Sequence, residues 1–75
     1  MMLNVTNRND EPESKDILDL DLDMNIGMKD NRYVVNLNNT YRLYDTFSTK
    51  EEAKIQMFSI ANARNKLESE LREYL

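Results

Sequence analysis

The clearest pattern in the chain is a strict alternation of apolar and polar residues from Leu18 to Met28. Every second position holds a leucine, a methionine or an isoleucine, and the positions between them hold three aspartates, an asparagine and a glycine. Side chains alternate between the two faces of a β-strand, so this pattern predicts a long strand over about residues 16–28 with one apolar and one carboxylate face. Gly27 predicts a bend or bulge near its end.

Two shorter runs predict the rest of an antiparallel sheet. Residues 33–37 alternate after a polar four-residue turn, and residues 40–47 form the next strand. The two asparagines between these runs, Asn38 and Asn39, fit a two-residue hairpin turn because asparagine tolerates positive φ. Asp45 falls on the apolar face of the last strand, so a bulge or an end is expected there.

A long amphipathic helix is predicted from Thr49 to about Tyr74, because this stretch lacks glycine and proline and its apolar residues recur at helical spacing. Ser48 and Glu51 match the S-x-x-E capping box that starts helices. A helix of about 26 residues rises about 39 Å, which is more than the predicted strands span. The apolar residues of its last turns are therefore expected either to cover the edge of the first strand or to form the interface of a symmetric homodimer: Leu67, Leu71, Tyr74 and Leu75.

Together these elements predict an α+β fold in which a three-stranded antiparallel meander packs on one long C-terminal helix, in the order β-β-β-α. Residues 1–14 are polar, contain the only proline and show no clear period, so they predict a flexible acidic tail. Residues 15–75 would then form a single domain. The order of the strands in the sheet stays open.

Composition narrows the chemistry. The chain has 75 residues, a net charge of −4, and neither cysteine nor histidine. Disulfides, thiol nucleophiles and the commonest general base and metal ligand are therefore excluded. The spacing of Asp21, Asp23 and Asn25 resembles the start of an EF-hand loop, but Ile26 stands where that loop needs glycine. We expect no enzyme activity, no cofactor and no metal site.

The negative charge is concentrated in the first part of the chain. Residues 1–31 contain eight acidic and three basic residues, whereas residues 32–75 contain six acidic and seven basic ones. A row of carboxylates at strand spacing imitates a nucleic-acid backbone, so the first hypothesis is a small acidic protein-binding module of the phage or mobile-element type. It would inhibit or regulate a partner protein by docking on a basic, nucleic-acid-binding surface. The residues predicted to bind that partner are Asp16, Asp19, Asp21, Asp23 and Tyr44.

The segment YRLYDTFSTKEEA, residues 41–53, supports a second hypothesis. It is similar to the passage from third strand to helix in AP2-type and integrase arm-binding domains, which read DNA with the exposed face of a sheet. The resemblance implies a DNA-binding regulator that uses Arg32, Arg42 and Tyr44, although the carboxylates of the first strand argue against direct nucleic-acid binding. A structural homodimer is the third hypothesis.

The chain also lacks the features that direct proteins to membranes. No apolar run approaches the roughly 18 residues of a membrane-spanning helix, and the first residues do not read as a signal peptide. We therefore expect a cytoplasmic, intracellular location, which includes the cytoplasm of an infected host cell, and no membrane partner.

Overall fold

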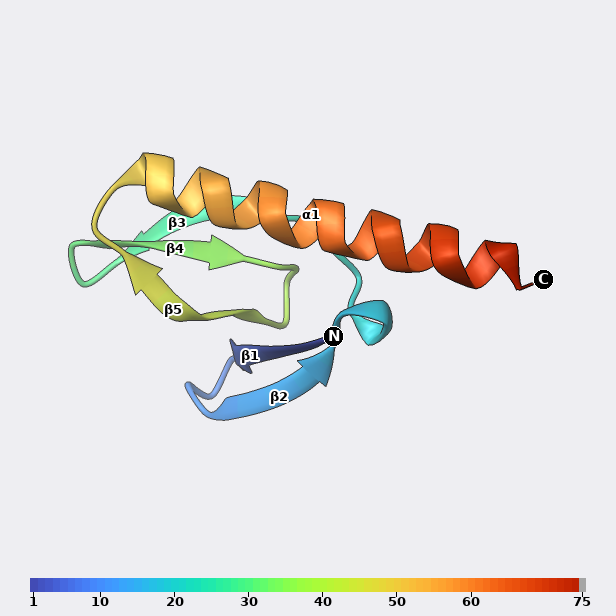
Figure 1. The fold of residues 1–75 in the computed structure, drawn as a ribbon. Helices are drawn as coiled ribbons and strands as arrows, with labels where there is room; N and C mark the ends of the chain where they lie inside the picture. The colour runs from blue at the N-terminus through green and yellow to red at the C-terminus, as the bar shows by residue number, and fades with distance from the viewer. Residues whose placement is uncertain (75) are drawn as a thin grey trace.

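The computed structural model describes residues 1–74 and contains a five-stranded antiparallel sheet, one short 3-10 turn and one C-terminal helix (Figure 1). The strands lie in the order β2-β1-β5-β4-β3. The predicted three-stranded sheet is therefore wrong by two strands, although β3, β4 and β5 do follow one another as antiparallel neighbours. The elements are β1 (Met2–Thr6), β2 (Pro12–Asp16), η1 (Ile17–Asp19), β3 (Asn25–Lys29), β4 (Arg32–Asn36), β5 (Arg42–Phe47) and α1 (Lys50–Glu73).

The N-terminal segment is a β-hairpin, so the predicted flexible tail is wrong. β1 pairs with β2 over its whole length and also with β5, and Val5 of β1 is fully buried. The Oδ1 atom of Asn7 closes the hairpin by accepting the backbone N–H groups of Asn9 (2.9 Å) and Glu11 (3.1 Å). Periodicity misses this hairpin because β1 has only five residues and β2 is a polar edge strand that begins with Pro12.

The predicted long strand over residues 16–28 is divided into four parts. Asp16 ends β2, η1 follows, residues 20–24 have no strand partner in the described structure, and β3 begins at Asn25. The chain leaves β2 because the carboxylate of Asp16 accepts the N–H of Leu18 at 3.0 Å and caps η1. Gly27 lies inside the regular β3–β4 register and forms no bulge. The register shift of the sheet lies instead between β4 and β5, opposite Val35.

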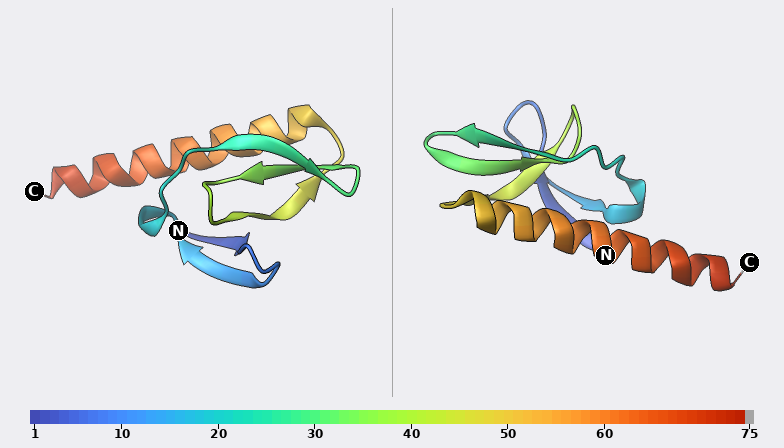
Figure 2. Two further views of the ribbon diagram at one scale, coloured as in Figure 1. Left: turned by 180° about the vertical axis from the view of Figure 1, so that it is seen from behind. Right: turned by 90° about the horizontal axis from the view of Figure 1, so that it is seen from above.

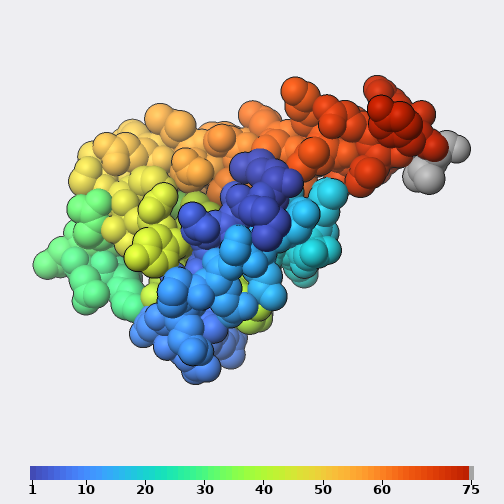
Figure 3. Space-filling view, turned by 60° about the horizontal axis from the view of Figure 1, so that its bottom comes forward, coloured from blue at the N-terminus to red at the C-terminus, as the bar shows by residue number. Residues whose placement is uncertain are grey.

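The core lies between α1 and one face of the sheet. Two views of the ribbon show α1 running along that face (Figure 2). Its largest fully buried side chains come from four different parts of the chain: Val5, Ile17, Val35, Leu37 and Ile60. The burial of each side chain removes apolar surface from water, which stabilises the fold by about 25 cal/mol for each Å² buried. The C-terminal part of α1 extends beyond the sheet (Figures 1 and 3).

Local geometry explains the tight turns and the helix start. Asp30 and Asn31 form the two-residue turn between β3 and β4, with φ values of 53° and 63°. Such a left-handed pair matches the twist of a hairpin, and aspartate and asparagine tolerate it best after glycine. The N-cap of α1 is Thr49, whose hydroxyl accepts the N–H of Glu52 at 3.2 Å. The capping motif therefore begins one residue later than the sequence indicated.

A pair of alanine substitutions tests the course of the chain after β2. Ile17→Ala should lower the free energy of unfolding by about 2–5 kcal/mol, because the fully buried side chain leaves a cavity. Leu18→Ala should cost less than about 1 kcal/mol, because Leu18 is 37% exposed. Urea unfolding followed by circular dichroism measures both values. A continuous strand with Leu18 on its apolar face would reverse their order.

Candidate functional site

Three aspartates lie on the connection between β2 and β3, residues 17–24, which we call the acidic connection. Asp19, Asp21 and Asp23 are exposed, and the alternate residues Leu20, Leu22 and Met24 pack against the core. Burial of the apolar residues therefore turns the three carboxylates outward. In the space-filling view, this part of the chain emerges beneath α1, beside the N-terminal hairpin (Figure 3).

Three hydrogen bonds hold the backbone of the acidic connection. The guanidinium of Arg64 on α1 donates to the carbonyl of Leu20 at 2.7 Å, and the side-chain amide of Asn38 donates to the carbonyl of Asp21 at 2.8 Å. The N–H of Asp23 donates to the carbonyl of Leu37, also at 2.8 Å. The helix on one side and the end of the sheet on the other therefore hold the backbone from which the carboxylates project.

The carboxylates of Asp19, Asp21 and Asp23 make no ion pair with any residue in the described range 1–74. They line a shallow hollow of about 350 Å³ together with the turn at residues 38–41. They are also not gathered into a cluster that could hold a metal ion, within the part of the chain that is described. Asp16 differs from them because its carboxylate caps η1.

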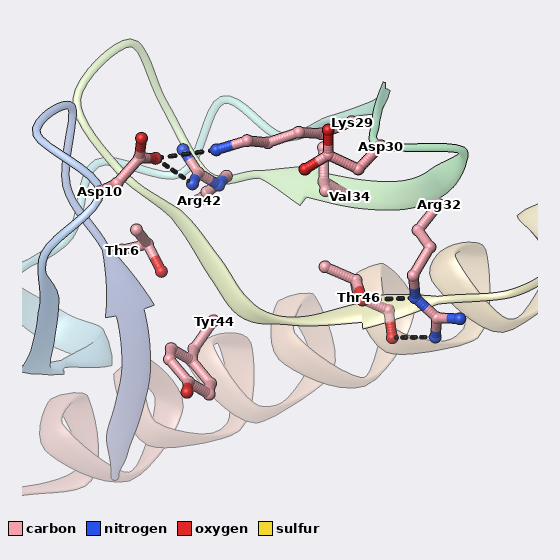
Figure 4. Close-up of a pocket in the computed structure, with 9 residues that line it drawn as sticks. All are labelled: Thr6, Asp10, Lys29, Asp30, Arg32, Val34, Arg42, Tyr44 and Thr46. Carbon is pink, nitrogen blue, oxygen red and sulfur yellow. Dashed lines mark hydrogen bonds and ion pairs between the residues drawn. The ribbon is translucent and has the colours of Figure 1, made fainter.

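The predicted site residue Tyr44 does not join this surface. It lies on β5, on the face of the sheet that faces away from α1, and lines a separate hollow of about 530 Å³ (Figure 4). Three cationic side chains from three strands line the same hollow: Lys29, Arg32 and Arg42. The sequence therefore predicted one site where the structure has two surfaces of different charge.

Most of the positive charge in the hollow is balanced from within. The carboxylate of Asp10 lies between Lys29, at 2.8 Å, and Arg42 (Figure 4). Hydrogen bonds from Arg42 and Lys29, together with the charge of Lys29, lower the pKa of Asp10 from its ordinary value of 3.8 to about 2. Arg32 instead donates to the hydroxyl of Thr46 at 2.6 Å and to its carbonyl at 3.2 Å.

A third surface is an apolar groove between β3 and the first half of α1, which sequence reasoning missed. It measures about 640 Å³ and is lined by Met24, Ile26, Lys50, Lys54, Met57, Phe58 and Ala61. Phe58 is 69% exposed. The signal that could have revealed the groove is the i, i+4 spacing of Lys54 and Phe58 and of Met57 and Ala61, which places these side chains next to one another on α1.

The end of α1 only partly matches the predicted dimer interface. Leu67 packs against the margin of the core, Leu71 is 53% exposed and Tyr74 is 88% exposed. Leu75 lies outside the described residues. An interface at this end of the helix stays a prediction.

Comparisons with protein-family models, with curated proteins and with solved structures find no match to this chain. The similarity of residues 41–53 to AP2-type and integrase arm-binding domains therefore also stays a prediction. In the described range, α1 and η1 included, no helix has the length and apolar character needed to cross a membrane.

The ion pairs of Asp10 give a prediction about pH. A carboxyl NMR titration should yield a pKa of about 2 for Asp10, and Arg42→Ala should return it towards 3.8. Since the folded-state pKa is the lower one, the contribution of Asp10 to stability is complete above pH about 4 and is lost as the pH falls through about 2. Asp10→Asn should therefore weaken the dependence of the unfolding free energy on pH in that range.

Arg32→Ala is the matched control for this titration, because Arg32 bonds to Thr46 and not to Asp10. It should leave the pKa of Asp10 unchanged. A pKa near 3.8 in the parent protein would contradict the ion-pair arrangement.

Proposed function

We propose that this chain is a small, non-enzymatic protein-binding module that inhibits or regulates a partner by docking the acidic connection on a basic surface of that partner. The observation that carries the proposal is the exposure of Asp19, Asp21 and Asp23, without a described counter-ion, on a backbone fixed by α1 and the sheet. Unpaired carboxylates keep their full charge available to a partner. A fixed backbone limits the entropy lost when a complex forms.

Electrostatics supports the same conclusion. The net charge of −4 steers the whole molecule towards positive surfaces. The three aspartates of the acidic connection then orient that side of the molecule towards the partner. The absence of histidine and cysteine and the exposure of the three aspartates favour binding over catalysis, because catalytic carboxylates need environments that separate their pKa values.

The acidic connection does not imitate a nucleic-acid backbone. That idea required the regular two-residue spacing of a long strand, and residues 16–28 do not form one. The proposed docking rests on the charge and the exposure of the three aspartates. The partner therefore needs a basic surface, but not a groove whose cations match the spacing of phosphates.

The triple variant Asp19→Asn/Asp21→Asn/Asp23→Asn tests this function. Immobilised protein is exposed to a nuclease-treated extract of the source organism, and the captured proteins are measured at low and at raised salt. Each carboxylate contributes about 0.5–1 kcal/mol to such a contact, so capture should fall about 10- to 100-fold in the triple variant. Capture by the parent should also fall as salt rises.

The matched control is Asp45→Asn/Glu70→Gln/Glu73→Gln, which removes the same charge from three exposed positions elsewhere. It should retain capture of the same proteins. Equal loss in both triple variants would mean that only net charge matters, and unchanged capture in the first would reject the acidic connection as the site.

The hollow on the outer face of the sheet favours a second candidate, a DNA-binding regulator. Arg32, Arg42 and Tyr44 gather there, on the face with which AP2-type and integrase arm-binding domains read DNA. Asp10 and Asp30 line the same hollow and would repel phosphates.

A mobility-shift assay with mixed duplex DNA at low salt separates the two candidates. The parent should show no shift, because the carboxylates of the outer face and the net negative charge oppose phosphate binding. A shift that disappears in Arg32→Ala/Arg42→Ala would favour the DNA-binding regulator over the protein-binding module.

A further inference from the structure

The two edges of the sheet have different chemistry. β2 forms one edge and carries Pro12, Glu13, Lys15 and Asp16, all residues that discourage pairing with another strand. β3 forms the other edge, and its sequence NIGMK has no charge before its last residue. Within the described residues, no strand pairs with the outer side of β3. This edge lacks the usual protection against strand addition.

The turn between β3 and β4 determines which backbone groups face this open edge. In a hairpin with a two-residue loop, the residues that flank the loop form a hydrogen-bonded pair, here Lys29 and Arg32. Such pairs alternate along the ladder, so Gly27 also bonds to β4. The N–H and C=O groups of Ile26 and Met28 therefore point away from β4, into the open edge.

We propose that β3 pairs antiparallel with β3 of a second copy of this chain, around a two-fold axis at Gly27. This register places Ile26 opposite Met28 of the second copy, and Met28 opposite Ile26. These are the residues whose backbone groups face outward, so the register satisfies four backbone hydrogen bonds across the axis. The hydrogen-bonding pattern of one edge thus fits its own symmetric copy.

The side chains fit the same register. Ile26 and Met28 both lie on the face towards α1, so the two cross-strand pairs on that face are apolar. On the outer face Lys29 stands opposite Asn25, and the two glycines face each other without side chains. No like charges oppose one another within the paired strands. This self-complementarity favours a second copy over an unrelated extended peptide.

The apolar groove supplies the contact area that a strand pair alone lacks. A stable interface buries about 800 Å² on each partner, more than five residues of backbone provide. The groove opens beside β3, and its lining residue Phe58 is 69% exposed. Met28, on the same face of β3 as Ile26, is 61% exposed. In the paired arrangement the two α1 helices run antiparallel on the same face of one ten-stranded sheet. Each copy then covers the exposed apolar residues of the other.

Sedimentation equilibrium from about 1 μM to about 1 mM chain concentration tests the dimer. The parent should reach the mass of two chains, and Met28→Lys should weaken association at least about tenfold, because it places one lysine per copy in an apolar contact. Met28→Leu should retain the dimer. Phe58→Ser tests the groove independently of the strand and should also weaken association.

Leu71→Glu is the control for the alternative interface at the end of α1, since Leu71 is exposed and lies far along the helix from the groove. It should leave the dimer intact. A dimer that Leu71→Glu dissociates and Met28→Lys does not would overturn the proposal in favour of the helix end. Circular dichroism of each variant confirms that its monomer is folded.

Amide hydrogen exchange gives a second readout that depends on the backbone alone. The amides of Ile26 and Met28 should exchange slowly at high chain concentration and faster on dilution. The amide of Gly27 should stay protected at both concentrations, because it bonds to β4. A parent that stays monomeric at about 1 mM, with fast exchange at Ile26 and Met28, would overturn the proposal and leave this edge to a strand from another protein. None of these measurements involves the acidic connection, so their failure would leave the proposed function untouched.

Discussion

The position of β1 between β2 and β5 determines the path of the rest of the chain. It makes β2 one edge of the sheet and β3 the other, so residues 17–24 must cross the width of the sheet. Five strands spaced about 4.8 Å apart require a crossing of about 19 Å. Eight residues cover that distance only when most of them are extended. The crossing is therefore a stretched segment that passes between the core and solvent.

This geometry couples the stability of the protein to the charge that it displays. A stretched segment with one side on the core must turn alternate residues inward, and here Leu20, Leu22 and Met24 pack on the core after Ile17, which is buried in the 3-10 turn. The polar residues that alternate with them, Asp21 and Asp23, are then forced outward. The exposed carboxylates are thus a consequence of apolar burial, and the hydrogen bond from Arg64 to Leu20 joins the helix to the same arrangement.

The acidic connection and the open edge of β3 are neighbours along the chain, because the connection leads directly into Asn25. Two β3 strands paired antiparallel would carry one acidic connection at each end of the pair. Such a dimer would present two anionic sites related by a two-fold axis, and a partner with two basic surfaces would then gain from effective concentration. Both interfaces use surfaces that the small core of a single chain leaves unburied.

The sequence by itself determined the long helix, the strands β4 and β5 and the outward direction of Asp19, Asp21 and Asp23, because each depends on periodicity along one segment. The alternation from Leu18 to Met28 was read as a strand because period two reports extended backbone with one buried face. It does not report hydrogen-bond partners. Only the tertiary structure decided that β1 inserts beside β5, that Ile17 and not Leu18 enters the core, and that Tyr44 lies away from the aspartates. Those outcomes depend on contacts between residues far apart in the sequence, which no local pattern encodes.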